Sequence, residues 1–173
     1  MKFTEYQLLA QRTSNPELDE RQHIENGALG LCGEAGEVAD LIKKMFMQGH
    51  ALDKDEVIEE LGDVAWYCAE LATHAKLVIR MDNMERVVYD SIPLTEKVTR
   101  LCYNAANTAA MFFYVKTEEK LHKQMLERTL GVCRVIAGEM GVSMSEVCKR
   151  NLEKLLRRYP EKFSTERSVN REG

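Results

Sequence analysis

The apolar residues of this chain recur every three or four positions along almost its whole length, and no segment alternates as a β-strand would. Such spacing places apolar side chains on one face of a helix, which must be buried against other helices. One stripe runs through an expected helix from about Glu20 to Gln48, and a second follows Asp53. The stripes comprise Ala28, Leu31, Ala35, Val38, Ile42 and Met45, then Val57, Leu61, Val64, Cys68 and Leu71. The sequence therefore predicts an all-α helical bundle.

Capping residues and glycines mark where the expected helices begin and end. Thr4 and Gln7 have the spacing of a capping box, which predicts a first helix that stops near Pro16. Gly49 should end the long second helix. Further boundaries are expected at Asp53 with Glu56, at Pro93 and Val115, at Thr117 and Met140, at Gly141, and at Ser143 with Glu146. Residues 76–91 give no clear prediction, and the polar tail after Phe163 is expected to be loose.

Composition excludes several classes of protein. The 173 residues fit a single all-α domain, residues 1–173, that is large enough to bury a core. A net charge of −4 and scattered basic residues argue against a nucleic-acid partner, and the absence of an apolar run of ~18 residues argues against a membrane span. The five cysteines include no C-x-x-C pair, so we expect reduced core thiols. The polar N-terminus does not read as a signal peptide, and we expect a cytoplasmic protein.

Two pairs of carboxylates flank the two apolar stripes. Glu34 and Glu37 are three residues apart and share one face of the second helix, and Glu60 and Asp63 repeat this spacing on the third. Antiparallel packing of these helices would gather four negative charges, which would raise their pKa values unless a cation lay among them. Oxygen ligands without histidine favour Mg²⁺ or Mn²⁺ over zinc. The sequence predicts a divalent-metal site here.

Three glycines, Gly30, Gly33 and Gly36, crowd the first carboxylate pair. A glycine inside a helix costs on the order of 1 kcal/mol relative to alanine. We therefore expect them to let another helix or a ligand approach closely.

A diiron bundle is the competing metal site. It requires two E-x-x-H motifs, and the candidate weighed here, Glu119 with His122, lies on a different helix from the carboxylate pairs. The other histidines, His23, His50 and His74, are expected at surfaces or helix ends without forming a cluster.

The same residues carry a family resemblance. The chain reads "LGLCGEAGEVADLIKK" from Leu29, then "EELGDVAWY" with 22 residues between Glu37 and Glu60, and finally "NLEKLLRRYPEKFS". These stretches resemble the MazG-like nucleotide pyrophosphohydrolases, whose signature is E-x-x-E followed after a spacer by E-x-x-D. That family belongs to the all-α NTP pyrophosphatases, with dimeric dUTPases, dCTP pyrophosphatases and phosphoribosyl-ATP pyrophosphatases. The similarity covers roughly residues 3–75 and 141–166.

The resemblance implies Mg²⁺-dependent hydrolysis of a nucleoside triphosphate to the monophosphate and pyrophosphate, as a house-cleaning activity on the nucleotide pool. Glu34, Glu37, Glu60 and Asp63 would be the metal ligands. Glu37 or Glu59 would accept the proton of the attacking water, and the sequence leaves this choice open. The family's assemblies imply a homo-oligomer, with a dimer favoured.

Several further residues are candidates for contacts with the substrate. Lys44 lies two turns after Glu37, and Tyr67 lies one turn after Asp63 on the same face. The resemblance adds Asn151, Lys154 and Arg158 from an N-x-x-K-x-x-x-R-Y-P pattern in the last helix. We expect the first helix to shape the base pocket through Tyr6, Gln7 and Arg12, and Trp66 to lie in the core or an interface rather than under a base.

Residues 92–160 read as a degenerate second copy of residues 20–90. Similar stretches begin at Leu31 and Leu101, at Leu61 and Leu130, and at Asn83 and Asn151, with offsets of 70, 69 and 68. In the second copy the four acidic positions become Asn104, Asn107, Thr129 and Val132, so only the first copy would hold metal. An alternative to an enzyme is a helical protein that keeps the fold but only senses nucleotides or binds a partner.

Overall fold

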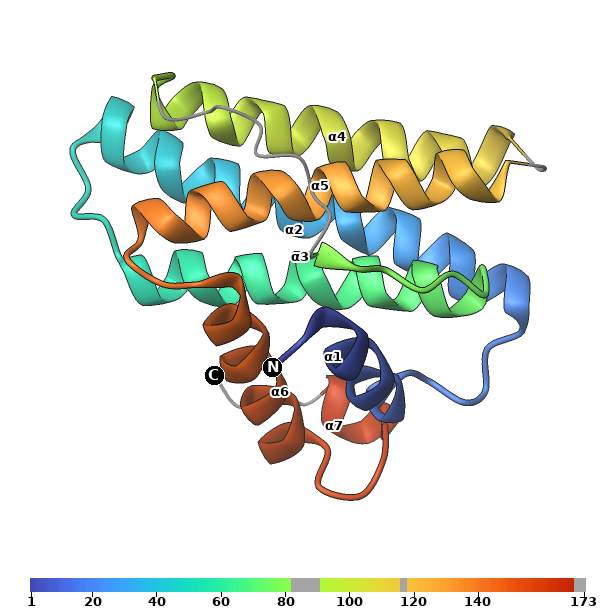
Figure 1. Ribbon diagram of the computed structural model, residues 1–173. Helices are drawn as coiled ribbons and strands as arrows, with labels where there is room; N and C mark the ends of the chain where they lie inside the picture. The colour runs from blue at the N-terminus through green and yellow to red at the C-terminus, as the bar shows by residue number, and fades with distance from the viewer. Residues whose placement is uncertain (82–90, 116–117, 170–173) are drawn as a thin grey trace.

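The computed structural model describes residues 1–81, 91–115 and 118–169, and every regular element in that part of the chain is helical (Figure 1). The expectation of an all-α fold is confirmed. The elements are α1 (Phe3–Ala10), the short 3₁₀ turn η1 (Gln11–Thr13), α2 (Glu20–Gln48), α3 (Lys54–His74), α4 (Leu94–Tyr114), α5 (Glu119–Glu139), α6 (Met144–Arg158) and α7 (Thr165–Val169).

Four long helices, α2 to α5, form an antiparallel bundle (Figure 1). Helix α2 packs against both α3 and α4, and α5 packs against α3 and α4. Helices α1 and α6 contact each other and lie against α3, outside the bundle. Helix α3 therefore sits between α2 on one side and the α1–α6 pair on the other.

The core is built from the apolar stripes that the sequence predicts. Every residue of the α3 stripe is buried, and so is the α2 stripe except Met45, which is half-buried. Leu101 on α4 and Leu130 on α5 are inaccessible to solvent and complete the centre of the bundle. Burial of such side chains is the main force that holds the helices together.

Several helix ends follow local capping chemistry. The Asp53 carboxylate accepts hydrogen bonds from the backbone N–H groups of Asp55 and Glu56, and Ser143 Oγ accepts one from Glu146 N. Gly49 and Gly141 have φ values of 73° and 88°, the left-handed conformation that favours glycine after a helix. These boundaries are where the sequence predicts them.

Two local predictions are wrong. Thr4 and Gln7 form no capping box, because α1 begins at Phe3 without a side-chain cap and the Gln7 amide instead donates to the Leu77 carbonyl oxygen at 2.8 Å. The tail after Phe163 is not loose throughout, because it contains α7, and Arg167 Nη1 donates to the Arg158 carbonyl oxygen at 3.2 Å.

The internal duplication stays a prediction. The paired positions Leu31 and Leu101, and Leu61 and Leu130, are all buried, as two copies in the same register would require. The third pairing involves residues 83–88, which lie outside the described residues.

The described helices include none that is both long and apolar enough to cross a bilayer. All five cysteines carry free thiols. Cys68, Cys133 and Cys148 are buried, and burial raises the pKa of each thiol. Cys32 departs from the expectation of core thiols because its side chain is exposed.

Candidate metal centre

Three carboxylates converge where α2 crosses α3. One oxygen each from Glu34, Glu60 and Asp63 lies within 4.8 Å of the others, and all three residues are half-buried. Glu37, one turn further along α2, is exposed and lies outside this group. We call Glu34, Glu60 and Asp63 the acid cluster. It contains three of the four carboxylates that the sequence predicts to converge.

The acid cluster holds a proton that isolated carboxyl groups would release. Burial is the largest influence and raises the pKa of Glu60 to about 8, with further increases from its hydrogen bond to Glu34 and from the charge of Asp63. Burial and the charge of Asp63 also raise the pKa of Glu34. These directions favour a protonated Glu60 that is hydrogen-bonded to Glu34, and a bound cation would take the place of that proton.

Helix α6 supplies the partners of Asp63. Asn151 Nδ2 donates to Asp63 Oδ1 at 2.7 Å, and Lys154 Nζ lies 2.6 Å from Asp63 Oδ2. Tyr6 OH donates to Asn151 Oδ1 at 2.7 Å, which fixes the orientation of the buried amide. Lys154 Nζ also lies 3.1 Å from the exposed carboxylate of Glu59. Asn151 and Lys154 therefore reach the acid cluster from a helix far away in the sequence.

Glycines allow these close approaches. A Cβ atom at Gly62 would lie 2.8 Å from Asn151 Cβ, so only glycine lets α6 come near enough for Asn151 to reach Asp63. A Cβ atom at Gly30 would lie 2.1 Å from the Tyr67 ring, which agrees with the predicted close approach. At Gly33 and Gly36 a Cβ atom would meet no described atom within 4 Å. The sequence therefore identified Gly30 correctly and missed Gly62.

A cavity of about 350 Å³ opens beside Glu34 and Asp63. Its walls include the aromatic rings of Trp66, Tyr67, Tyr159 and Phe163, together with Arg158, Asn15 and Asn26. Trp66 Nε1 donates to Thr13 Oγ1 at 2.9 Å, which fixes the indole against the loop after α1. Trp66 packs partly against the core as expected, but it also lines this cavity.

The remaining candidates lie elsewhere. Lys44 Nζ pairs with Asp40 at 2.7 Å, and this partner raises the pKa of Lys44. None of Tyr6, Gln7 and Arg12 lines the cavity: Tyr6 is fully buried, Gln7 is bonded to Leu77, and Arg12 Nη2 donates to the Pro160 carbonyl oxygen at 3.4 Å. The first helix therefore supports the site without shaping this pocket.

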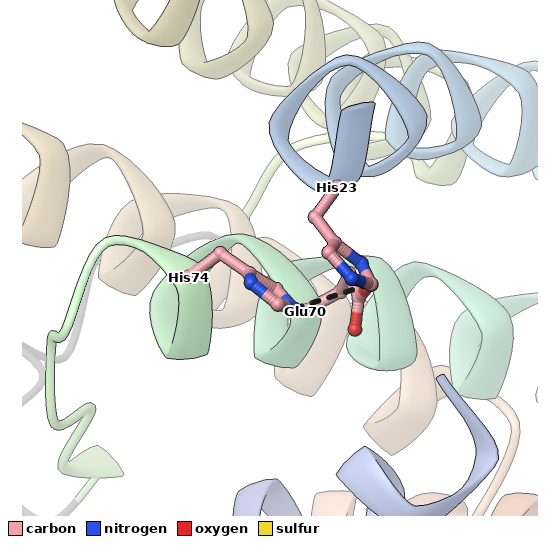
Figure 2. Close-up of side chains that lie close together, drawn as sticks. All are labelled: His23, Glu70 and His74. Atoms are coloured by element: carbon pink, nitrogen blue, oxygen red, sulfur yellow. Dashed lines mark hydrogen bonds and ion pairs between the residues drawn. The ribbon is translucent and has the colours of Figure 1, made fainter. Parts of the chain in front are cut away.

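The expectation that the histidines form no cluster is wrong. The imidazoles of His23 and His74 are stacked, with ring centroids 3.7 Å apart, beside the carboxylate of Glu70 (Figure 2). Glu70 and His74 are four residues apart and continue the face of Glu60, Asp63 and Tyr67, a spacing that was visible in the sequence.

The E-x-x-H motif at Glu119 and His122 does not gather ligands. His122 Nε2 bonds the Met111 carbonyl oxygen at 3.1 Å, and its ring stacks on Phe112. Within the described residues, neither Glu119 nor His122 belongs to a group of three potential metal ligands.

Comparison with known proteins finds a family similarity over part of the chain. The model of the MazG nucleotide pyrophosphohydrolase domain matches residues 22–100, which contain the whole acid cluster. This segment of the chain is MazG-like. The MazG-like segment comprises most of α2, all of α3 and the beginning of α4, so it omits the α6 residues that contact Asp63.

A similar protein is "Gene 37 protein" of Mycobacterium phage L5, which is 44% identical over 48 residues. The match covers 25% of this chain and 42% of that protein, so it spans less than half the length of the relative. No solved structure matches the chain.

Proposed function

We propose that this MazG-like chain hydrolyses a nucleoside or deoxynucleoside triphosphate to the monophosphate and pyrophosphate, with Mg²⁺ as cofactor. The observation that carries the proposal is the acid cluster, in which half-buried Glu34, Glu60 and Asp63 converge beside a cavity with aromatic walls. Carboxylates that would hold a divalent cation, beside an aromatic pocket, suit a substrate whose phosphate chain binds the cation and whose flat base enters the pocket.

The chemistry of the acid cluster fits a hard divalent cation. Its donors are carboxylate oxygens alone, which Mg²⁺ and Mn²⁺ prefer. The pKa values of Glu34 and Glu60 are raised chiefly by burial and further by the charge of Asp63. Glu34, Glu60 and Asp63 would hold the metal, with Glu37 joining them from the exposed side of α2. Bound Mg²⁺ would neutralise phosphate oxygens and make a coordinated water more acidic.

Residues around the cluster would orient the triphosphate. Lys154 and Asn151 already bond Asp63, so they would neighbour any phosphate held there. Arg158 and Tyr67 line the cavity and would contact phosphate or sugar, while the faces of Trp66 and Tyr159 would flank the base. Lys44 remains a candidate for binding the departing pyrophosphate, provided that its ammonium group leaves Asp40 and contacts the phosphate instead.

The group that accepts the proton of the attacking water is still a choice between Glu37 and Glu59. Glu59 is exposed and held by Lys154, and it lines a separate cavity of about 340 Å³ with Arg150 and Arg157. Glu37 is exposed on the α2 side of the cluster. We also propose that the chain forms the dimer implied by the resemblance through this side of α2, where Gly33 and Gly36 leave the helix surface open.

The test is a panel of ribonucleotides and deoxyribonucleotides incubated with the purified chain and Mg²⁺, with monophosphate and pyrophosphate both quantified. We expect turnover of at least one triphosphate, its loss with EDTA, and its loss in Glu60→Gln. The matched control is Glu119→Gln, an exposed carboxylate on α5 that should leave turnover unchanged. Nucleotide binding without turnover under Mg²⁺ and Mn²⁺ would refute hydrolysis and favour a nucleotide-sensing protein.

A further inference from the structure

We propose that His23, Glu70 and His74 form a second metal site that binds a transition-metal ion of the Zn²⁺ class. The site joins the beginning of α2 to the end of α3 (Figure 2). One ligand atom from each residue lies within 4.8 Å of the others. Two imidazole nitrogens and one carboxylate oxygen are a donor set that zinc and cobalt accept readily.

The contacts around Glu70 leave one imidazole nitrogen, His74 Nε2, without a hydrogen bond in the described part of the chain. His23 Nδ1 lies 2.7 Å from Glu70 Oε1, and Ser14 Oγ donates to the same oxygen at 2.7 Å. His74 Nε2 lies 3.6 Å from that oxygen, beyond hydrogen-bond range, and this buried nitrogen has no hydrogen-bond partner among the described residues. A buried nitrogen without a partner is unfavourable, and an ion at this position would satisfy it.

The arrangement leaves room for the adjustment that binding requires. The two rings are within 10° of parallel, whereas an ion shared by both nitrogens must lie near the plane of each ring, so one imidazole must turn. His74 lies on the wall of a cavity of about 900 Å³, which gives its ring space to rotate and gives an ion a path inward. Asp19, Glu20 and Glu25 line this cavity with one basic residue, Arg21, so the entrance favours cations.

This second site is separate from the acid cluster. Glu70 follows Asp63 by two helical turns, about 10 Å along α3, and Tyr67, whose ring packs against Gly30, comes between them on that helix. The acid cluster offers only oxygen donors and the second site offers mainly nitrogen, so the two should prefer different ions. An ion at His23, Glu70 and His74 would act as a clamp between α2 and α3 and would not take part in chemistry.

The test uses the full chain, freed of metal, in a Cys32→Ser background so that the exposed thiol does not compete for the ion. Excess Mg²⁺ is present to occupy the acid cluster. Titration with Co²⁺, followed by visible absorption, should give one equivalent with the spectrum of nitrogen and oxygen ligands. Zn²⁺ should displace it and raise the midpoint of thermal unfolding by about 5 °C.

Matched variants assign the site. We expect His74→Gln to weaken Co²⁺ binding at least tenfold, and the control His50→Gln, an exposed histidine before α3, to leave binding unchanged. Glu60→Gln should also leave it unchanged, which separates this site from the acid cluster and from any outcome of the nucleotide panel.

Imidazole ¹⁵N spectra of the chain with its histidines intact provide a readout that needs no histidine variant to fold. Zn²⁺ should shift the nitrogens of two histidines and leave those of the others unmoved. The proposal is wrong if Co²⁺ does not bind with one equivalent, or if Zn²⁺ leaves the imidazole nitrogens unshifted. It is also wrong if binding survives His74→Gln but disappears in Glu60→Gln. The three residues would then form a hydrogen-bonded network only.

Discussion

Gly62→Ala is the sharpest test of how α6 reaches the acid cluster. The new methyl carbon would lie 2.8 Å from Asn151 Cβ and 3.0 Å from Asn151 Nδ2. Asn151 Cβ is attached directly to the backbone of α6, so rotation of the side chain cannot relieve the first of these contacts. Helix α6 must move outward, and the 2.7 Å hydrogen bond from Asn151 to Asp63 must lengthen.

The expected magnitude combines opposing terms. Overpacking in a core costs about 1–3 kcal/mol, and weakening a hydrogen bond to a charged carboxylate costs about 1.5–3 kcal/mol when the bond is lost entirely. Replacing glycine by alanine in a helix returns about 1 kcal/mol. We expect a net loss of about 2 kcal/mol in the free energy of unfolding, or ~4–8 °C in the unfolding midpoint for a chain of this size.

Thermal and urea unfolding, monitored by far-ultraviolet circular dichroism, measure this change. The matched control is Gly33→Ala, because a Cβ atom there meets no described atom within 4 Å. Gly33→Ala should stabilise the helix by up to about 1 kcal/mol. If Gly62→Ala stabilises the protein as much as Gly33→Ala does, the claim that glycine permits the approach of α6 is wrong.

Three further predictions concern the same region. Because Glu60 has a pKa raised from 4.5 to about 8, the metal-free protein should lose stability as pH rises between those values, and Mg²⁺ or Glu60→Gln should flatten the profile in pH-dependent urea unfolding. Asn151→Ala should lower the free energy of unfolding by about 2–3 kcal/mol, more than Tyr6→Phe, because it removes one hydrogen bond from Asp63 and one from the Tyr6 hydroxyl; equal losses in urea titrations would contradict this. If the aromatic cavity holds the base, Trp66→Ala should raise KM about tenfold or more with a smaller change in kcat, and an unchanged KM would exclude that role.

The helices themselves were predictable because their signals are local. The apolar stripes of α2 and α3, the caps at Asp53 and Ser143, and the glycines at the ends of helices act within one or two turns of the chain. The capping box predicted for the first helix does not form because a distant residue competes for the side chain of Gln7. Gln7 has the right spacing, but the Leu77 carbonyl, 70 residues away, takes its amide.

The acidic residues of the candidate site were also predictable, because two pairs on adjacent helical faces converge when those helices pack antiparallel. The sequence did not distinguish Glu37, which stays exposed, from Glu34, Glu60 and Asp63. That difference depends on the rotation of α2 against α3, which all the side chains between them determine together.

Local patterns were enough to predict the helical class, the long helices and the paired carboxylates. The bonds from Asn151 and Lys154 to Asp63, the place of Trp66 in a cavity wall, and the contact of His23 with Glu70 and His74 result from tertiary packing. Hydrophobic spacing and capping are properties of neighbouring residues. These contacts join distant segments: His23 and Glu70 are 47 residues apart, and Asp63 and Lys154 are 91 residues apart. Such meetings depend on how closely whole helices approach, and here glycines at the crossings set that distance.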